Sequence, residues 1–157
     1  MFQVFKGVAA ALVAVGVTVS ALPRSADAHT PRDAVAVVSA LYAAHAALLS
    51  GEGMPLYLTP QLAGRFFDPS VMSRLAQAEI EFDFLYDAQD FDIANLRVVP
   101  DPDVPVTDGT FHVVVTFTNF GEPQRLLYVL RADNPLGELA VTDIVGPNWT
   151  LDGILPE

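Results

Sequence analysis

The stretch FHVVVTFTNFGEPQRLLYVLR, residues 111–131, decides the fold of this chain. Two runs rich in β-branched and aromatic residues, 111–120 and 124–131, flank the turn residues Gly121, Glu122 and Pro123. Runs of this composition are typical of β-strands, and the short connection predicts an antiparallel hairpin. Alternate side chains of the first run point to opposite faces of a sheet, and neither set is strongly polar. We therefore expect both faces to be at least partly covered, or one of them to line a cavity.

Two further strand-like runs, 93–99 and 139–145, lie on either side of this hairpin in the sequence. Each is rich in Val, Leu and Ile and is separated from the hairpin by turn residues. Because short connections join strands that run in opposite directions, the four runs predict an antiparallel meander. A segment of alternating acidic and apolar residues, 79–84, precedes them and has the period of an extended chain.

Helix signals come before the strands. Thr30 can cap a helix that begins at Pro31, and apolar residues at helical spacing continue it to about Ser50. Shorter helices are predicted from Thr59-Pro60 to about residue 67 and from about residue 70 to 78. Helices followed by a run of strands predict an α+β fold, with the N-terminal helices packed on one face of a curved antiparallel β-meander.

The first 28 residues have the pattern of a secretory signal peptide. Lys6 supplies the positive charge, residues 8–19 form an apolar core, and Ala26-Asp27-Ala28 is a cleavage site of small residues. The apolar stretch is shorter than the roughly 20 residues of a membrane span. We therefore expect cleavage before His29, which leaves a single α+β domain of residues 29–157 in the periplasm or the medium. No second apolar stretch of spanning length is expected, and so no membrane span after cleavage.

The composition excludes several functions. The whole chain has a net charge of −11, and it contains no cysteine, so disulfides, thiol chemistry and lipidation are excluded. Nucleic acids and anionic membranes need a basic patch, which this acidic chain lacks. The sequence contains neither a glycine-rich phosphate loop nor a Gly-x-Ser-x-Gly elbow. We expect no cofactor and no nucleophilic catalytic residue.

The loop 86–92 is the first candidate for a ligand-binding site. Tyr86, Asp87, Gln89 and Asp90 would present a phenol, carboxylates and an amide within a few residues, and Asp83 lies just before them. The alternative is that Asp87, Asp90 and Asp92 cap turns by accepting hydrogen bonds from nearby backbone amides, as aspartate commonly does. Calcium is a further alternative, to which Glu79 and Glu81 would contribute oxygens. No EF-hand spacing is present, so solvation of an exposed acidic face is favoured over a metal site.

Two residues of the strand 124–131 complete the candidate set. Arg125 is expected either to pair with a carboxylate, which is the commoner outcome, or to meet an anionic ligand, and Tyr128 faces the opposite way. A catalytic alternative places Asp83 opposite Tyr57 or Tyr128 for proton transfer. Among the histidines, His45 is expected to be a hydrogen-bonded core residue and His112 to lie on a strand, with acid–base catalysis as the alternative for both.

Several segments together resemble a known family. They are YLTP at 57–60, FDFLYDAQDFDI at 82–93, VTFTNFGEP at 115–123, and Asp143-Ile144 with Trp149-Thr150-Leu151. These segments are similar to the bacterial exported family catalogued as domain of unknown function 3828. The likeness spans most of residues 29–157, but the turn Leu136-Gly137-Glu138-Leu139 departs from the family pattern. The resemblance implies a fold similar to the nuclear transport factor 2-like cone, in which helices close a curved sheet. It implies no activity, because that fold hosts enzymes and binders alike.

The function expected from these observations is a non-enzymatic module that binds a small ligand or an envelope protein. A carboxylate- and tyrosine-dependent isomerase or hydrolase is one alternative, and it predicts a deep pocket that contains a buried acid. An accessory subunit of an envelope complex is the other, and it predicts an exposed apolar patch.

Overall fold

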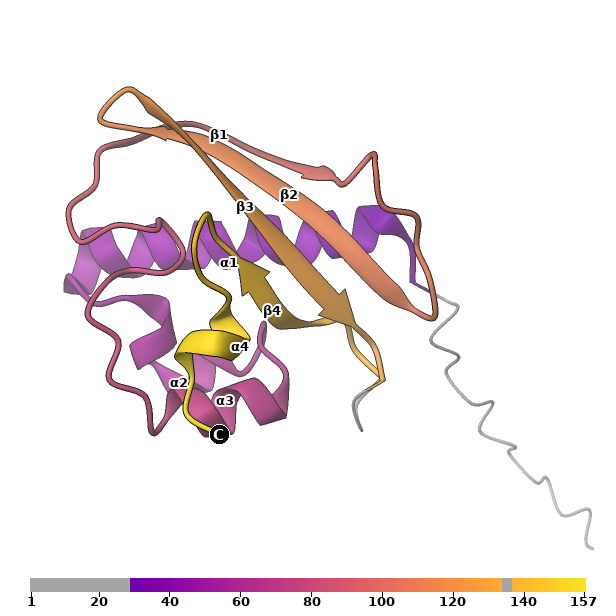
Figure 1. The fold of residues 1–157 in the computed structure, drawn as a ribbon. Helices are drawn as coiled ribbons and strands as arrows, with labels where there is room; N and C mark the ends of the chain where they lie inside the picture. The colour runs from indigo at the N-terminus through magenta and orange to yellow at the C-terminus, as the bar shows by residue number, and fades with distance from the viewer. Residues whose placement is uncertain (1–28, 134–136) are drawn as a thin grey trace, which may run out of the picture.

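The computed structural model describes residues 29–133 and 137–157, and it confirms the α+β class. The predicted signal peptide, residues 1–28, lies outside the described residues. Figure 1 shows a twisted antiparallel sheet with one long helix running across one face, and the short helices gathered below that helix around the C-terminus. The elements are α1 (Pro31–Glu52), η2 (Leu56–Leu58), α2 (Pro60–Ala63), α3 (Pro69–Leu75), β1 (Ile93–Pro100), β2 (Thr110–Asn119), β3 (Glu122–Arg131), β4 (Ala140–Val145) and α4 (Leu151–Ile154).

Helix α1 begins and ends at the predicted signals. Thr30 and Asp33 form a capping box, in which each side chain bonds the backbone N–H of the other, and Gly53 ends the helix with φ 66°. The buried face, which carries Leu41, Tyr42 and His45, packs against β1 and β2. The buried position of His45 confirms the expectation of a core residue.

The hydropathy of α1 corrects one expectation. An 18-residue window of this 22-residue helix reaches a mean hydropathy of 1.7, so by length and composition the helix is apolar enough to cross a membrane, contrary to the expectation that no stretch after residue 28 approaches that length. Most of this hydropathy comes from valines and leucines. The buried residues recur at helical spacing along one face, while alanines such as Ala40, Ala43 and Ala46 are exposed on the other; the buried ones are Ala34, Val38, Leu41, Tyr42 and His45. The helix therefore has the one-sided pattern of a core helix.

The four strands form one sheet in the order β1-β2-β3-β4, and every pairing is antiparallel. This confirms the predicted meander. The inner face of β2 carries Phe111, Val113, Val115 and Phe117, all buried against the helices. The outer face is only partly covered, since Val114 is buried while His112 and Thr116 are half-buried.

The turn between β2 and β3 is tighter than the sequence predicts. Strand β3 begins at Glu122, and Asn119 pairs directly with Glu122. The turn therefore consists of Phe120 and Gly121, with φ values of 49° and 84°. A two-residue turn with both φ values positive matches the twist of the flanking strands, but it normally has Asn or Asp, not Phe, at the first position.

The segment 76–92 forms no strand among the described elements. Burial alternates from Glu79 to Phe82 as predicted, but the alternation ends at Asp83, which is buried together with Phe84. The chain turns back here, and an isolated bridge joins Asp83 to Ala88. The predicted short helices are also shorter in the structure, because α2 ends at Ala63 and α3 ends at Leu75. Residue 136 of the divergent hairpin turn lies outside the described residues.

Candidate ligand-binding cavity

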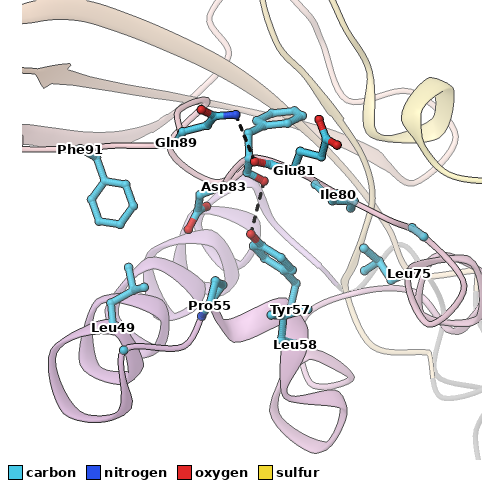
Figure 2. A pocket seen from close by; sticks show the side chains of 13 residues that line it. Leu49, Pro55, Tyr57, Leu58, Leu75, Ile80, Glu81, Asp83, Gln89 and Phe91 are labelled. Atoms are coloured by element: carbon cyan, nitrogen blue, oxygen red, sulfur yellow. Dashed lines mark hydrogen bonds between the residues drawn. The ribbon is translucent and has the colours of Figure 1, made fainter.

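A cavity of about 440 Å³ opens where α1 ends. Its walls come from four places in the sequence: the end of α1, the η2 segment, the end of α3 with the residues after it, and the segment 80–91. Most of the walls are apolar, as ligand pockets usually are. Figure 2 shows the lining side chains, which are Leu49, Gly53, Pro55, Tyr57, Leu58, Leu75, Ala78, Ile80, Glu81, Phe82, Asp83, Gln89 and Phe91.

Asp83 is the buried acid of this cavity. Its backbone exchanges two hydrogen bonds with Ala88, of 2.8 and 3.2 Å, which close the turn 83–88. Its Oδ1 accepts a 2.9 Å hydrogen bond from the backbone N–H of Leu85. Only 6% of the residue is exposed. Asp83 therefore caps a turn, a role expected from the sequence for Asp87, Asp90 and Asp92 instead, and it does so inside the protein with one carboxylate oxygen left for other contacts.

His45 occupies the other side of that carboxylate. Its Nε2 lies 2.8 Å from Asp83 Oδ2, and the imidazole is fully buried. Its Nδ1 accepts a 3.2 Å hydrogen bond from the backbone N–H of Leu56. A ring nitrogen that accepts a hydrogen bond carries no proton, so the proton of the neutral ring is on Nε2 and faces Asp83. The pair is then a neutral imidazole against an ionised carboxylate.

The contact between the two side chains is close but poorly aligned. Neither His45 Nε2 nor Asp83 Oδ2 completes a hydrogen bond with any residue in the ranges 29–133 and 137–157, although the two atoms lie within 2.8 Å of each other. Buried polar atoms are nearly always hydrogen-bonded in native structures, so an exception marks a strained or functional place.

Aromatic rings surround this pair. Tyr86 lies 4.9 Å from the His45 ring and 4.9 Å from the Phe91 ring, measured between centroids. Tyr57 packs at 4.4 Å on Phe84, and its hydroxyl donates a 3.3 Å hydrogen bond to the carbonyl of Phe82. Burial, followed by the nearby negative charge of Asp83, raises the pKa of both Tyr57 and Tyr86 above its ordinary value. Both phenols therefore stay protonated at neutral pH.

Behind the cavity, two tyrosines form a buried hydrogen-bonded chain. Tyr128 donates a 2.9 Å bond to the hydroxyl of Tyr42, which donates a 2.7 Å bond to the carbonyl of Leu85. Burial is the main cause that raises the pKa of Tyr42 and of Tyr128. Tyr128 thus fixes the hydroxyl of Tyr42, and Tyr42 fixes the backbone at Leu85, close to Asp83.

The structure brings some of the sequence candidates together and separates others. Asp83 and Gln89 line the cavity, and Gln89 donates a 3.4 Å hydrogen bond to the carbonyl of Glu81. Tyr86 lies next to the cavity, in contact with His45 and Phe91. The carbonyl of Asp90 accepts a 3.3 Å hydrogen bond from Asn119, at the base of the β2–β3 turn.

The remaining candidates have other roles. Asp87 accepts a 2.6 Å hydrogen bond from the indole N–H of Trp149, so it holds the C-terminal segment in place. Tyr128 is fully buried in the core. Arg125 lies on the outer face of the sheet, where its guanidinium is 3.8 Å from Asp101, so the expected pairing with a carboxylate is confirmed.

The sequence candidates did not include His45, Tyr57 and Phe91 among the binding residues. The spacing of His45 on the apolar face of α1 placed it in the core, but no local signal pairs it with a residue far along the chain. The described residues contain no group of three or more side chains that could hold a metal ion. A larger hollow, about 660 Å³, lies between His29 and Leu139 and contains none of the sequence candidates.

No protein-family model, curated protein or solved structure matches this chain.

Proposed function

We propose that this chain is an exported domain, folded as a cone similar to that of the nuclear transport factor 2-like proteins, that binds a small ligand in the cavity beside Asp83. The observation that carries the proposal is a cavity of about 440 Å³ whose lining includes a buried carboxylate in contact with a buried histidine. Burial of an ionised carboxylate costs several kcal/mol unless its surroundings compensate for it. A mostly apolar cavity whose wall includes a buried carboxylate and its histidine partner has the features of a binding site.

The geometry favours binding over acid–base catalysis. Tyr57 and Asp83 share the cavity, which is the arrangement that the catalytic alternative needs. However, the Tyr57 hydroxyl is bonded to the carbonyl of Phe82, and less than 1 Å² of Asp83 Oδ2 is exposed. Proton transfer requires direct reach to the substrate, whereas electrostatic binding does not.

Export to the periplasm or the medium is part of the proposal, and its support is the pattern of residues 1–28. An accessory role in an envelope complex is the second candidate. It is favoured by large exposed apolar side chains at the cavity end of the molecule, such as Leu58, which is 61% exposed at the cavity wall.

A thermal-shift screen with a blocked cavity tests the proposed function. Ala78 lines the cavity, whereas Ala76, two residues before it, is exposed outside it. Ala78→Phe should fill the cavity, and Ala76→Phe is the matched control. A ligand that binds only the folded state and is present at 100 times its Kd stabilises the protein by about 2.7 kcal/mol. For a domain of this size, that raises the Tm by several degrees.

We expect compounds that raise the Tm of the wild-type protein and of Ala76→Phe but not of Ala78→Phe. Compounds that shift all three proteins equally would bind elsewhere and would contradict the proposed site. A broad panel with no effect on the wild-type Tm would count in favour of the accessory role in an envelope complex. Capture of a specific partner protein by immobilised residues 29–157 would then establish that role.

A further inference from the structure

We propose that the ligand of this cavity is an organic cation, an ammonium group on an apolar or aromatic body, held with its charge near Asp83. This inference rests on the proposed function, because it names the chemical class that the same cavity would select. It follows from the contact between His45 and Asp83, from the lack of an arginine paired with Asp83 among the described residues, and from the chemistry of the walls.

The pair carries one uncompensated negative charge. Leu56 donates its backbone N–H to His45 Nδ1, which leaves the imidazole neutral. The Asp83 carboxylate accepts one hydrogen bond, from the backbone N–H of Leu85 to Oδ1. The arginines that form ion pairs in the described residues bind other acids: Arg74 binds Asp152, Arg125 binds Asp101 and Arg131 binds Asp133. Within residues 29–133 and 137–157, no arginine forms an ion pair with Asp83.

The unsatisfied oxygen belongs to a residue of the cavity wall. Asp83 Oδ2 completes no hydrogen bond with the residues that the structure describes, and the residue itself lines the cavity. In Figure 2 the Asp83 carboxylate lies between the rings of Phe91 and Tyr57. A positive charge within about 4–6 Å of a carboxylate stabilises its ionised form, and water-poor walls strengthen this attraction. A cation in the cavity therefore needs no direct bond to Oδ2.

The walls distinguish an organic cation from other ligands. Among the described lining residues there is no lysine, arginine or histidine, and the charged ones are Glu81 and Asp83, so an anion is repelled. Tyr57, Phe82 and Phe91 provide aromatic faces that attract cations. A hard metal ion needs six to eight oxygens, whereas these walls are mainly apolar. An ammonium with an apolar body matches both the charge and the surface.

The test uses three probes that share one hydrocarbon body: phenylbutylamine, phenylbutanol and phenylbutyrate, which are cationic, neutral and anionic. Binding to the wild-type protein is followed by amide chemical shifts in two-dimensional NMR, which detects weak ligands and shows where they bind. We expect the amine to bind at least ten-fold more tightly than the alcohol, the carboxylate to bind weakest, and the shifts to cluster around the cavity.

Charge-neutral variants assign the selectivity to the buried acid. Asp83→Asn should reduce the preference for the amine over the alcohol to about two-fold or less. Glu81→Gln should lower the same affinity ratio by a smaller factor. Asp103→Asn removes an exposed acid in the β1–β2 loop and should leave the preference unchanged. If Asp83→Asn fails to fold, the wild-type ranking of the three probes together with Glu81→Gln still decides the question.

The outcomes separate this inference from the proposed function. Binding of the alcohol or the carboxylate in the cavity as tightly as the amine would overturn the cationic class while supporting the cavity as a ligand site. An amine preference that survives Asp83→Asn would also overturn it. Shifts spread over the acidic surface, without a cluster at the cavity, would contradict both proposals.

Discussion

The hydrogen-bonded chain from Tyr128 through Tyr42 to Leu85 predicts an unequal response to two otherwise identical changes. Tyr128→Phe removes the first donor but leaves Tyr42 bonded to the carbonyl of Leu85. It should cost the net value of one hydrogen bond, about 1 kcal/mol. Tyr42→Phe removes the bond to Leu85 and also leaves the buried Tyr128 hydroxyl without its acceptor. A stranded buried donor adds about 1–3 kcal/mol, so the total should be near 3 kcal/mol.

The double variant tests the mechanism rather than the size of the effect. With both hydroxyls removed, no tyrosine donor is stranded, so the double variant should cost no more than Tyr42→Phe alone. The two single changes should therefore be non-additive by about 1 kcal/mol or more, as expected for residues in one network. Urea unfolding followed by circular dichroism measures each free energy of unfolding by linear extrapolation. Additive effects, or a larger loss for Tyr128→Phe than for Tyr42→Phe, would refute the reasoning.

Four further predictions concern other parts of the fold. Gly146→Ala would place a Cβ against the indole of Trp149, closer than van der Waals contact allows. It should destabilise the domain by about 1–3 kcal/mol and shift the emission of the single tryptophan, and unchanged emission would contradict this. Phe120→Asn should stabilise the domain by about 1 kcal/mol in urea unfolding, because Phe120 is 64% exposed and strained at φ 49°; a loss of stability would reveal an unseen contact. The hydrogen bond from the Thr30 side chain lowers the pKa of Asp33 below 3.8. The stability that ionised Asp33 contributes is therefore present above pH 3.8 and is lost as the pH falls through the lowered value, so the Tm difference between wild type and Asp33→Asn should vanish in acid. Burial raises the pKa of all four tyrosines above 10.0. The stability that comes from their protonated forms is therefore complete below pH 10.0 and is lost as the pH rises through the raised values. Phenolate absorbance should appear together with unfolding rather than before it.

The sequence by itself determined the class and the order of the elements. The strands were predictable because β-branched and aromatic runs with turn residues between them are local signals, and short connections restrict the pairing to a meander. Helix α1 was predictable at both ends because Thr30 and Asp33 cap it and Gly53 ends it through their own conformations. The burial of His45 followed in the same way from its position on the apolar face of the helix.

Only the tertiary structure decided which side chains form the site. The alternation of 79–84 placed Asp83 among exposed acids, but the turn to Ala88 directs it inward, and that turn depends on long-range packing. Residue 83 meets His45 because α1 crosses beneath the segment 80–91, a contact between residues far apart in the sequence. The hydrogen bond from Trp149 to Asp87 is likewise a contact between residues far apart in the sequence. Local composition identifies residues that can bind a ligand, whereas the convergence of distant segments decides which of them share a cavity.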